Sequence, residues 1–113
     1  MACIFCEIAE GRRPSRTVHA DDQLVAIHDV RPQAPTHILV VPRRHVTSLL
    51  DLEPGDDGLL GAMVRTARDV ARGLGLGERG FRLVMNCGDD AGTSVYHIHL
   101  HLLGGRALGW PPG

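Results

Sequence analysis

The chain has 113 residues, of which 12 are basic and 13 acidic, and its formal net charge is −1. Every basic residue is arginine, which excludes chemistry that needs a lysine amine, such as Schiff-base formation or a P-loop. The near-neutral charge gives no basic footprint for nucleic acid or an anionic membrane, and no apolar run approaches the ~18 residues of a membrane span. The length predicts one domain over residues 1–113.

The chain begins without the positive and apolar segments of a signal peptide, so we expect a cytoplasmic protein. Its three cysteines are then expected to be free or bound to metal rather than joined in disulfides.

Taken in chain order, the patterns predict an α+β domain. A short helix is expected over residues 3–10, and a longer one over 54–74, where apolar side chains from Leu59 to Leu74 recur at helical spacing. Strands are expected over residues 16–20, 23–30, 36–42, 81–87 and 95–103. Three early strands and a final pair favour a mainly antiparallel five-stranded sheet with two helices.

The most informative stretch is the final strand, with histidines at 97, 99 and 101. Because side chains alternate along a strand, His97, His99 and His101 are expected on one face, with Ile98 and Leu100 turned toward a core. Two chemistries suit such a histidine row. One is metal ligation; the other is phosphate chemistry, with one imidazole as nucleophile and its neighbours as hydrogen-bond donors. The loop 92–94 before the strand offers backbone N–H groups for a phosphate, which favours the second.

The sequence His97-Ile-His-Leu-His-Leu-Leu103 resembles the signature of the histidine triad (HIT) superfamily. The segments 28–37, 94–96 and 110–113 are also similar to the Hint branch, the nucleotide-binding phosphoramidases. The resemblance covers nearly the whole chain. It implies the HIT fold, and a homodimer whose sheets join into one ten-stranded sheet. It also implies hydrolysis of adenosine 5′-phosphoramidates to AMP through a nucleotidyl-histidine, with no metal at the phosphorus.

The resemblance also implies roles for individual residues. The middle histidine, His99, would be the nucleophile. His101 and His37 would contact the phosphate, and Ser94 would hydrogen-bond near the leaving nitrogen. The other positions expected to contact the nucleotide are Asp29 (at the ribose), Val30, Phe5, Leu39, Asn86, Gly92, Val95 and Trp110. Two departures from the Hint pattern are Thr93, where a Gln often stands, and the small residues at 107–109 before Trp110, which could change the leaving-group preference.

A second constellation lies at the start of the chain, where Cys3 and Cys6 form a C-x-x-C pair. Such a pair is half of a zinc site. Some bacterial HIT proteins complete it with two histidines, and the matching positions here are His45 and His97. The resemblance therefore implies a structural zinc, with two free cysteines as the alternative.

Three rival interpretations stay open. The first is a dinucleoside polyphosphate hydrolase of the Fhit-like branch, against which Ser94 and the Trp-Pro-Pro-Gly ending argue. The second is a nucleotide-binding regulatory module with incidental turnover. The third is a metallohydrolase that holds catalytic zinc on His97, His99 and His101.

Overall fold

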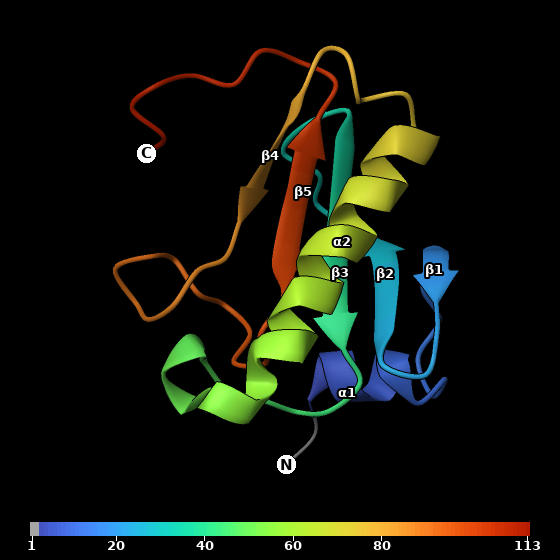
Figure 1. Ribbon diagram of the computed structural model, residues 1–113, viewed down its shortest axis with the longest axis vertical. Helices are drawn as coiled ribbons and strands as arrows, with labels where there is room; N and C mark the ends of the chain where they lie inside the picture. The colour runs from blue at the N-terminus through green and yellow to red at the C-terminus, as the bar shows by residue number, and fades with distance from the viewer. Residues whose placement is uncertain (1–2) are drawn as a thin grey trace.

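The computed structural model describes residues 3–113 and shows one antiparallel sheet with a helix on each side (Figure 1). The strands are β1 (Thr17–Ala20), β2 (Leu24–His28), β3 (Thr36–Pro42), β4 (Phe81–Val84) and β5 (Leu100–Gly104), and the helices are α1 (Ile4–Ala9) and α2 (Asp57–Gly73). Their order in the sheet is β1-β2-β3-β5-β4, with every neighbouring pair antiparallel. This confirms the predicted α+β class and the five-stranded sheet.

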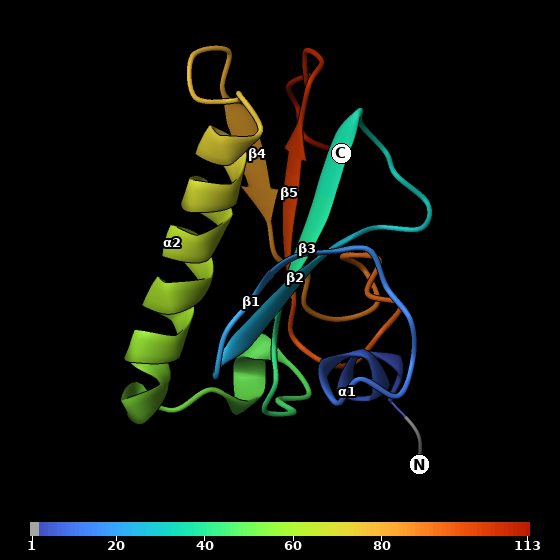
Figure 2. The ribbon, with the colours of Figure 1, turned by 90° about the vertical axis from the view of Figure 1, so that its right-hand side faces the viewer.

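A different helix packs on each face of the sheet. α2 lies along one face, and α1 lies against the other near one end of the strands (Figure 2). Strand β2 shows the division: Leu24 and Ala26 join the core beneath α2, while Val25 and Ile27 join the core beside α1. Because both faces are covered, β2 and β3 are apolar almost throughout rather than alternating with polar residues.

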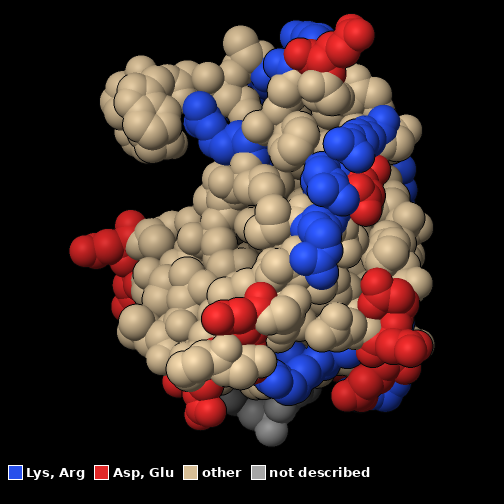
Figure 3. Space-filling view, in the orientation of Figure 1, with Lys and Arg blue, Asp and Glu red and all other residues tan. Residues whose placement is uncertain are grey.

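Helix α2 follows the predicted stripe closely. Leu59, Met63, Ala67 and Ala71, spaced by four residues, are its buried positions. Its outer face carries the exposed arginines at 65, 68 and 72, which lie over the helix as a row of basic side chains (Figure 3). The first turn of the predicted helix is instead a 3-10 turn, Pro54–Asp56. A second such turn, Leu49–Asp51, was not predicted.

The predicted strand 95–103 is wrong in its first half, since β5 begins only at Leu100. The preceding residues bond to the segment after β3 rather than continuing the ladder. The N–H of Ile98 donates to the Val46 carbonyl at 2.8 Å, and the ring of His97 donates to the Pro42 carbonyl at 2.7 Å. The predicted strand 81–87 likewise ends early, at Val84. The core positions were correct, because Ile98, Leu100 and Leu102 are buried beneath α2.

The segment after β5 extends away from the body beside the edge strand β4 (Figure 1). The space-filling view shows a hollow beneath it (Figure 3). Arg82 of β4 holds this segment through hydrogen bonds to the Leu108 and Gly109 carbonyls, at 3.4 and 2.9 Å. The Arg82 guanidinium also lies 5.8 Å from the centre of the Trp110 ring. Trp110 itself is 82% exposed.

Among the described residues, neither helix is long and apolar enough to cross a membrane.

Candidate active site and metal centre

A cleft of about 240 Å³ opens on the α1 side of the sheet. Its walls come from α1, from the end of β2 and the loop after it, and from the segment leading into β5. The lining residues are Ile4, Phe5, Ile8, Ile27, His28, Asp29, Val30, Arg31, Leu39, Ser94, Val95, His99 and His101. A larger hollow beside it shares Ile27, Asp29 and Val30 and continues to Arg16. The cleft is apolar at the α1 end and polar at the histidine end, the division usual in small-molecule sites.

His99 lines the cleft, and a hydrogen bond fixes which of its ring nitrogens carries the proton. Its Nδ1 lies 2.8 Å from the backbone carbonyl of His97, which can only accept, so Nδ1 carries the proton. In the neutral ring Nε2 then bears the lone pair. Phe5 packs edge-on against the His99 ring, with centroids 4.9 Å apart. Burial lowers the pKa of His99, which keeps the imidazole neutral and nucleophilic at pH 7.

A second pair of rings, His37 and His101, is ordered in the same way. The backbone N–H of Gln33 donates to His37 Nδ1 at 3.0 Å, so the ring proton of His37 lies on Nε2. That nitrogen is 2.8 Å from His101 Nδ1, which must accept, so His101 carries its own proton on Nε2. Burial, and then repulsion from His99 and His37, lower the pKa of His101 to about 4. Burial also lowers the pKa of His37. The hydrogen bonds therefore run in one direction: the Gln33 N–H donates to His37, and His37 donates to His101, which keeps its own proton on Nε2.

Asp29 is the first residue after β2, and its carboxylate lies near both His37 and the backbone of Arg31. Its Oδ1 accepts from the backbone N–H of Arg31 at 2.8 Å, and its Oδ2 lies 3.4 Å from His37 Nε2. The carboxylate lines the cleft and retains acceptor capacity for hydroxyl groups. Ser94 lines the same cleft from the segment before β5.

The structure brings most, but not all, of the predicted nucleotide contacts to this cleft. Phe5 and Leu39 are buried in its wall, Val95 also lines it, and Val30 is 93% exposed at its rim. Three predicted contacts, Asn86, Gly92 and Trp110, do not line it within this chain.

Sequence reasoning missed Ile4, Ile8 and Ile27, which form much of the apolar wall. The signal was present in the chain. Ile4 and Ile8 stand four residues apart on the short helix, and therefore on one face. Ile27 lies on the same side of β2 as Val25.

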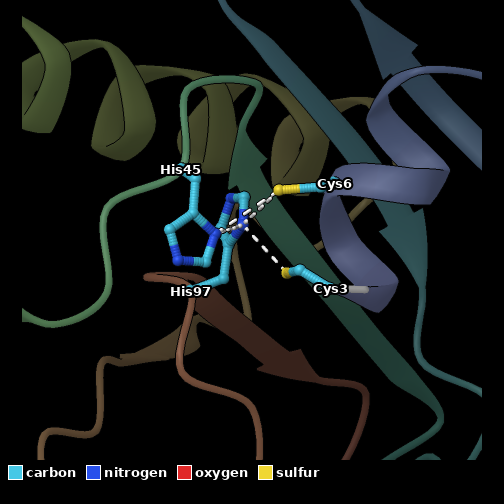
Figure 4. A group of neighbouring side chains, drawn as sticks. All are labelled: Cys3, Cys6, His45 and His97. Carbon is cyan, nitrogen blue, oxygen red and sulfur yellow. Dashed lines mark hydrogen bonds between the residues drawn. The ribbon is translucent and has the colours of Figure 1, made fainter. Parts of the chain in front are cut away.

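The four predicted metal ligands meet beside the start of α1 (Figure 4). Cys3 is the residue before α1 and Cys6 lies within it, while His45 comes from the segment after β3 and His97 from the segment before β5. The His97 Nδ1 atom lies 3.4 Å from Cys3 Sγ, 3.5 Å from Cys6 Sγ and 3.1 Å from His45 Nδ1. Cys6 Sγ lies 3.4 Å from His45 Nδ1, and all four ligand atoms lie within 4.8 Å of one another.

This group fits a tetrahedral zinc ion. Zinc bonds of about 2.0–2.3 Å to nitrogen and sulfur place neighbouring ligand atoms about 3.3–3.8 Å apart, close to the spacings found here. His97 donates from Nε2 to the Pro42 carbonyl at 2.7 Å, so the lone pair of its Nδ1 faces the two sulfurs. Burial, followed by hydrogen bonding and charge repulsion from Cys3, raises the pKa of the Cys6 thiol. A cation would offset this by favouring the thiolate.

A second group, Asp29 with His37 and His101, also has potential ligand atoms close together. It is poorly suited to a metal ion, because the Gln33 N–H occupies His37 Nδ1 and leaves the ring proton on the nitrogen that faces the group. The row of His97, His99 and His101 does not converge on one ion either, since His97 directs Nδ1 to the cysteines and His99 directs Nδ1 to a carbonyl. The geometry therefore argues against the metallohydrolase alternative.

Comparisons with known proteins agree with this arrangement. A family model described as "Scavenger mRNA decapping enzyme C-term binding" matches residues 2–108. An HIT-like protein of Synechocystis is 44% identical over 110 residues, which cover 97% of this chain and 96% of that protein.

Two solved structures are also informative. A HIT family hydrolase from Legionella pneumophila is 46% identical, with a TM-score of 0.98 over 99% of this chain and 100% of that one. A zinc-bound histidine triad family protein from Mycobacterium smegmatis is 33% identical, with a TM-score of 0.82 over 94% of this chain and 76% of its own. The sequence match, the shared fold and the three histidines together show that the chain belongs to the histidine triad (HIT) superfamily.

Proposed function

We propose that the protein is a purine nucleoside phosphoramidase of the Hint branch, which hydrolyses adenosine 5′-phosphoramidates to AMP. The observation that carries the proposal is the state of His99. Its Nδ1 proton is committed to the His97 carbonyl, so the lone pair of Nε2 is available inside a cleft of nucleotide character. The similarity to HIT family hydrolases supports a hydrolytic reaction.

In the proposed reaction, the Nε2 lone pair of His99 attacks the α-phosphorus as the bond from phosphorus to the amine breaks. The leaving nitrogen takes up a proton from solvent, which the second step returns, and Ser94 hydrogen-bonds near it. Water then attacks phosphorus, breaks the histidine–phosphorus bond and releases AMP with a proton. Imidazole suits this role, because its phosphorus–nitrogen bond is labile enough for turnover.

The other residues would stabilise charge and orient the nucleotide. His101 would donate its Nε2 proton to a phosphate oxygen. His37, whose Nε2 proton is donated to His101 Nδ1, would support that contact from behind. Asp29 would accept from both ribose hydroxyls. The base would lie among the apolar side chains of Phe5, Leu39 and Val30.

We also propose that Cys3, Cys6, His45 and His97 hold a structural zinc ion. The donor set and spacing described above support this, as does the zinc-bound relative. Bound zinc would join α1 to the segment before β5 and so stabilise the fold around the cleft. The proposed reaction uses none of its chemistry. Free thiols that ligate metal suit a reducing compartment, so we propose that the protein is cytoplasmic.

A homodimer is the third part of the proposal. The hollow beside β4 and the exposed Trp110 leave room for a second copy, whose sheet would continue this one. Trp110 does not line the cleft of its own chain, so the predicted nucleotide contact would be made across the dimer.

A direct test compares three compounds: an adenosine 5′-phosphoramidate with an alkyl amine, a diadenosine polyphosphate, and AMP. The proposal expects AMP release from the first with much higher kcat/KM than from the second. Faster cleavage of the diadenosine polyphosphate would favour the Fhit-like alternative. Tight AMP binding with no turnover of either substrate would favour a regulatory module.

A further inference from the structure

We infer that Arg106 is a positioning residue for this reaction, because it fixes the backbone segment that sets the ring protons of His37 and His101. The inference rests on the proposed function for its kinetic consequence. Its structural consequence, the position of two ring protons, can be measured without any substrate.

Arg106 hydrogen-bonds to the loop that follows Asp29, although it lies 73 residues later in the chain than Gln33 of that loop. Its Nε and Nη2 atoms both donate to the backbone carbonyl of Gln33, at 3.2 and 2.9 Å. A planar guanidinium that donates twice to one oxygen restrains both its position and its direction. The side chain is exposed and outside the cleft, so it has no direct access to the phosphorus.

The backbone just before Arg106 lies close to the loop that contains Gln33. The register pairs Thr36 of β3 with Gly104 of β5, so the two chain segments leave the sheet together. Gly105 has a φ of +90°, which few other residues adopt. A Cβ atom placed there would lie 2.9 Å from the Pro35 side chain. The glycine therefore both turns the chain and permits the close contact that brings Arg106 to Gln33.

Gln33 passes this restraint to the histidines through its other backbone group. Its N–H donates to His37 Nδ1 at 3.0 Å, and His37 Nε2 lies 2.8 Å from His101 Nδ1. If the N–H moved away, His37 could carry its proton on either nitrogen. His101 would then lose the donor that places its own proton on Nε2, where the phosphate would be contacted. A carboxylate that orients a catalytic histidine acts in the same way; here the agent is a backbone amide held by an arginine.

The first measurement is ¹⁵N NMR of the histidine rings in the full-length protein without nucleotide. Wild type should show His37 and His101 as single tautomers with the proton on Nε2. Arg106→Ala should show a mixture of tautomers at His37, with the α-helical and sheet signals of the fold retained. Unchanged tautomers in the variant would overturn the inference, whatever the enzyme hydrolyses.

The second measurement is steady-state hydrolysis of the phosphoramidate. Arg106→Ala should lower kcat on the order of tenfold, the scale seen when the outer partner of a functional histidine is removed. KM should change little, since Arg106 does not touch the nucleotide. Arg106→Lys, which keeps one donor, should recover part of kcat. A rise in KM with unchanged kcat would contradict a positioning role.

Two controls separate this role from general damage. Arg79→Ala removes an exposed arginine from the turn between α2 and β4 and should leave kcat and the tautomers unchanged. Arg72→Ala, at an exposed arginine in the last turn of α2, should likewise leave kcat and the tautomers unchanged. If wild type failed to turn over while the tautomer result held, the proposed function would fail and the structural inference would stand.

Discussion

His99 donates its Nδ1 proton to the backbone carbonyl of His97, across 2.8 Å. The same His97 directs its ring toward Cys3 and Cys6 in the proposed zinc group. His97 therefore connects the two sites: its side chain belongs to the proposed zinc group, and its backbone carbonyl orients the ring of His99. Phe5, which stands between the two cysteines in the chain, packs against both rings, with centroids 5.9 Å from His97 and 4.9 Å from His99.

Loss of a zinc ligand should therefore lower stability first. We expect Cys6→Ser to lower the melting temperature and to abolish the stabilisation that added zinc gives wild type. That stabilisation would be about 4 kcal/mol when free zinc exceeds its Kd a thousandfold. Calorimetry with and without a chelator measures both effects. Cys87→Ser, at a half-buried cysteine outside the group, is the matched control. Equal responses of the two variants to chelator would contradict the zinc proposal.

Asp29 should determine affinity for the ribose. In Asp29→Asn the neutral amide replaces a charged acceptor, and charged hydrogen bonds contribute about 1.5–3 kcal/mol. The Kd for AMP should therefore rise on the order of tenfold or more. Titration calorimetry with AMP and with 2′-deoxy-AMP gives the test, because the variant should discriminate between them less than wild type does. Unchanged discrimination would mean that the carboxylate is a loop anchor for Arg31 alone.

Acid should destabilise the protein partly through His101. Its pKa is lowered to about 4, whereas a histidine in an unfolded chain has a pKa near 6.5. Between these values the unfolded chain binds a proton that the folded chain does not, so stability falls as the pH drops through that window. Denaturant unfolding at pH 7 and pH 4.5 should show a smaller loss for His101→Asn than for wild type. A larger loss in the variant would contradict a neutral buried ring.

Ser94 should matter most for poor leaving groups. Removing its hydroxyl in Ser94→Ala should lower kcat for an alkyl-amine phosphoramidate on the order of tenfold, the scale of one lost hydrogen bond of about 0.5–1.5 kcal/mol. An aryl-amine substrate, whose leaving nitrogen needs less assistance, should lose less. Parallel kinetics on the two substrates provide the measurement. An equal loss on both would place Ser94 at the phosphate instead of the leaving group.

The fold was largely predictable because its signals are local. The apolar spacing of α2 and the uninterrupted apolar run of β3 each identify their element without reference to the rest of the chain. The start of β5 was not predictable in this way. His97 and Ile98 have a strand-like pattern, but their hydrogen bonds go to Pro42 and Val46, more than fifty residues earlier.

The sequence pointed to many of the residues around the cleft, but it did not predict the hydrogen bonds that join them. The alternating pattern identified the three histidines and the resemblance implied their roles; the structure brings two of them to the cleft and the third to the cysteines. The hydrogen bonds from Arg106 to Gln33 have no sequence signature, because the acceptor is a backbone carbonyl, which every residue has. Trp110 was expected at the nucleotide, but in this chain it is exposed and does not line the cleft.

The central claim is that His99 attacks phosphorus through Nε2, and trapping the covalent intermediate tests it most directly. Wild type, His99→Ala and the control His19→Ala, at a half-buried histidine of β1 that does not line the cleft, would be mixed with an adenosine 5′-phosphoramidate and quenched during turnover. Intact-mass analysis should show a transient adenylyl adduct on wild type and on the control. His99→Ala should show neither the adduct nor AMP release. An adduct or full AMP release in His99→Ala would contradict the account.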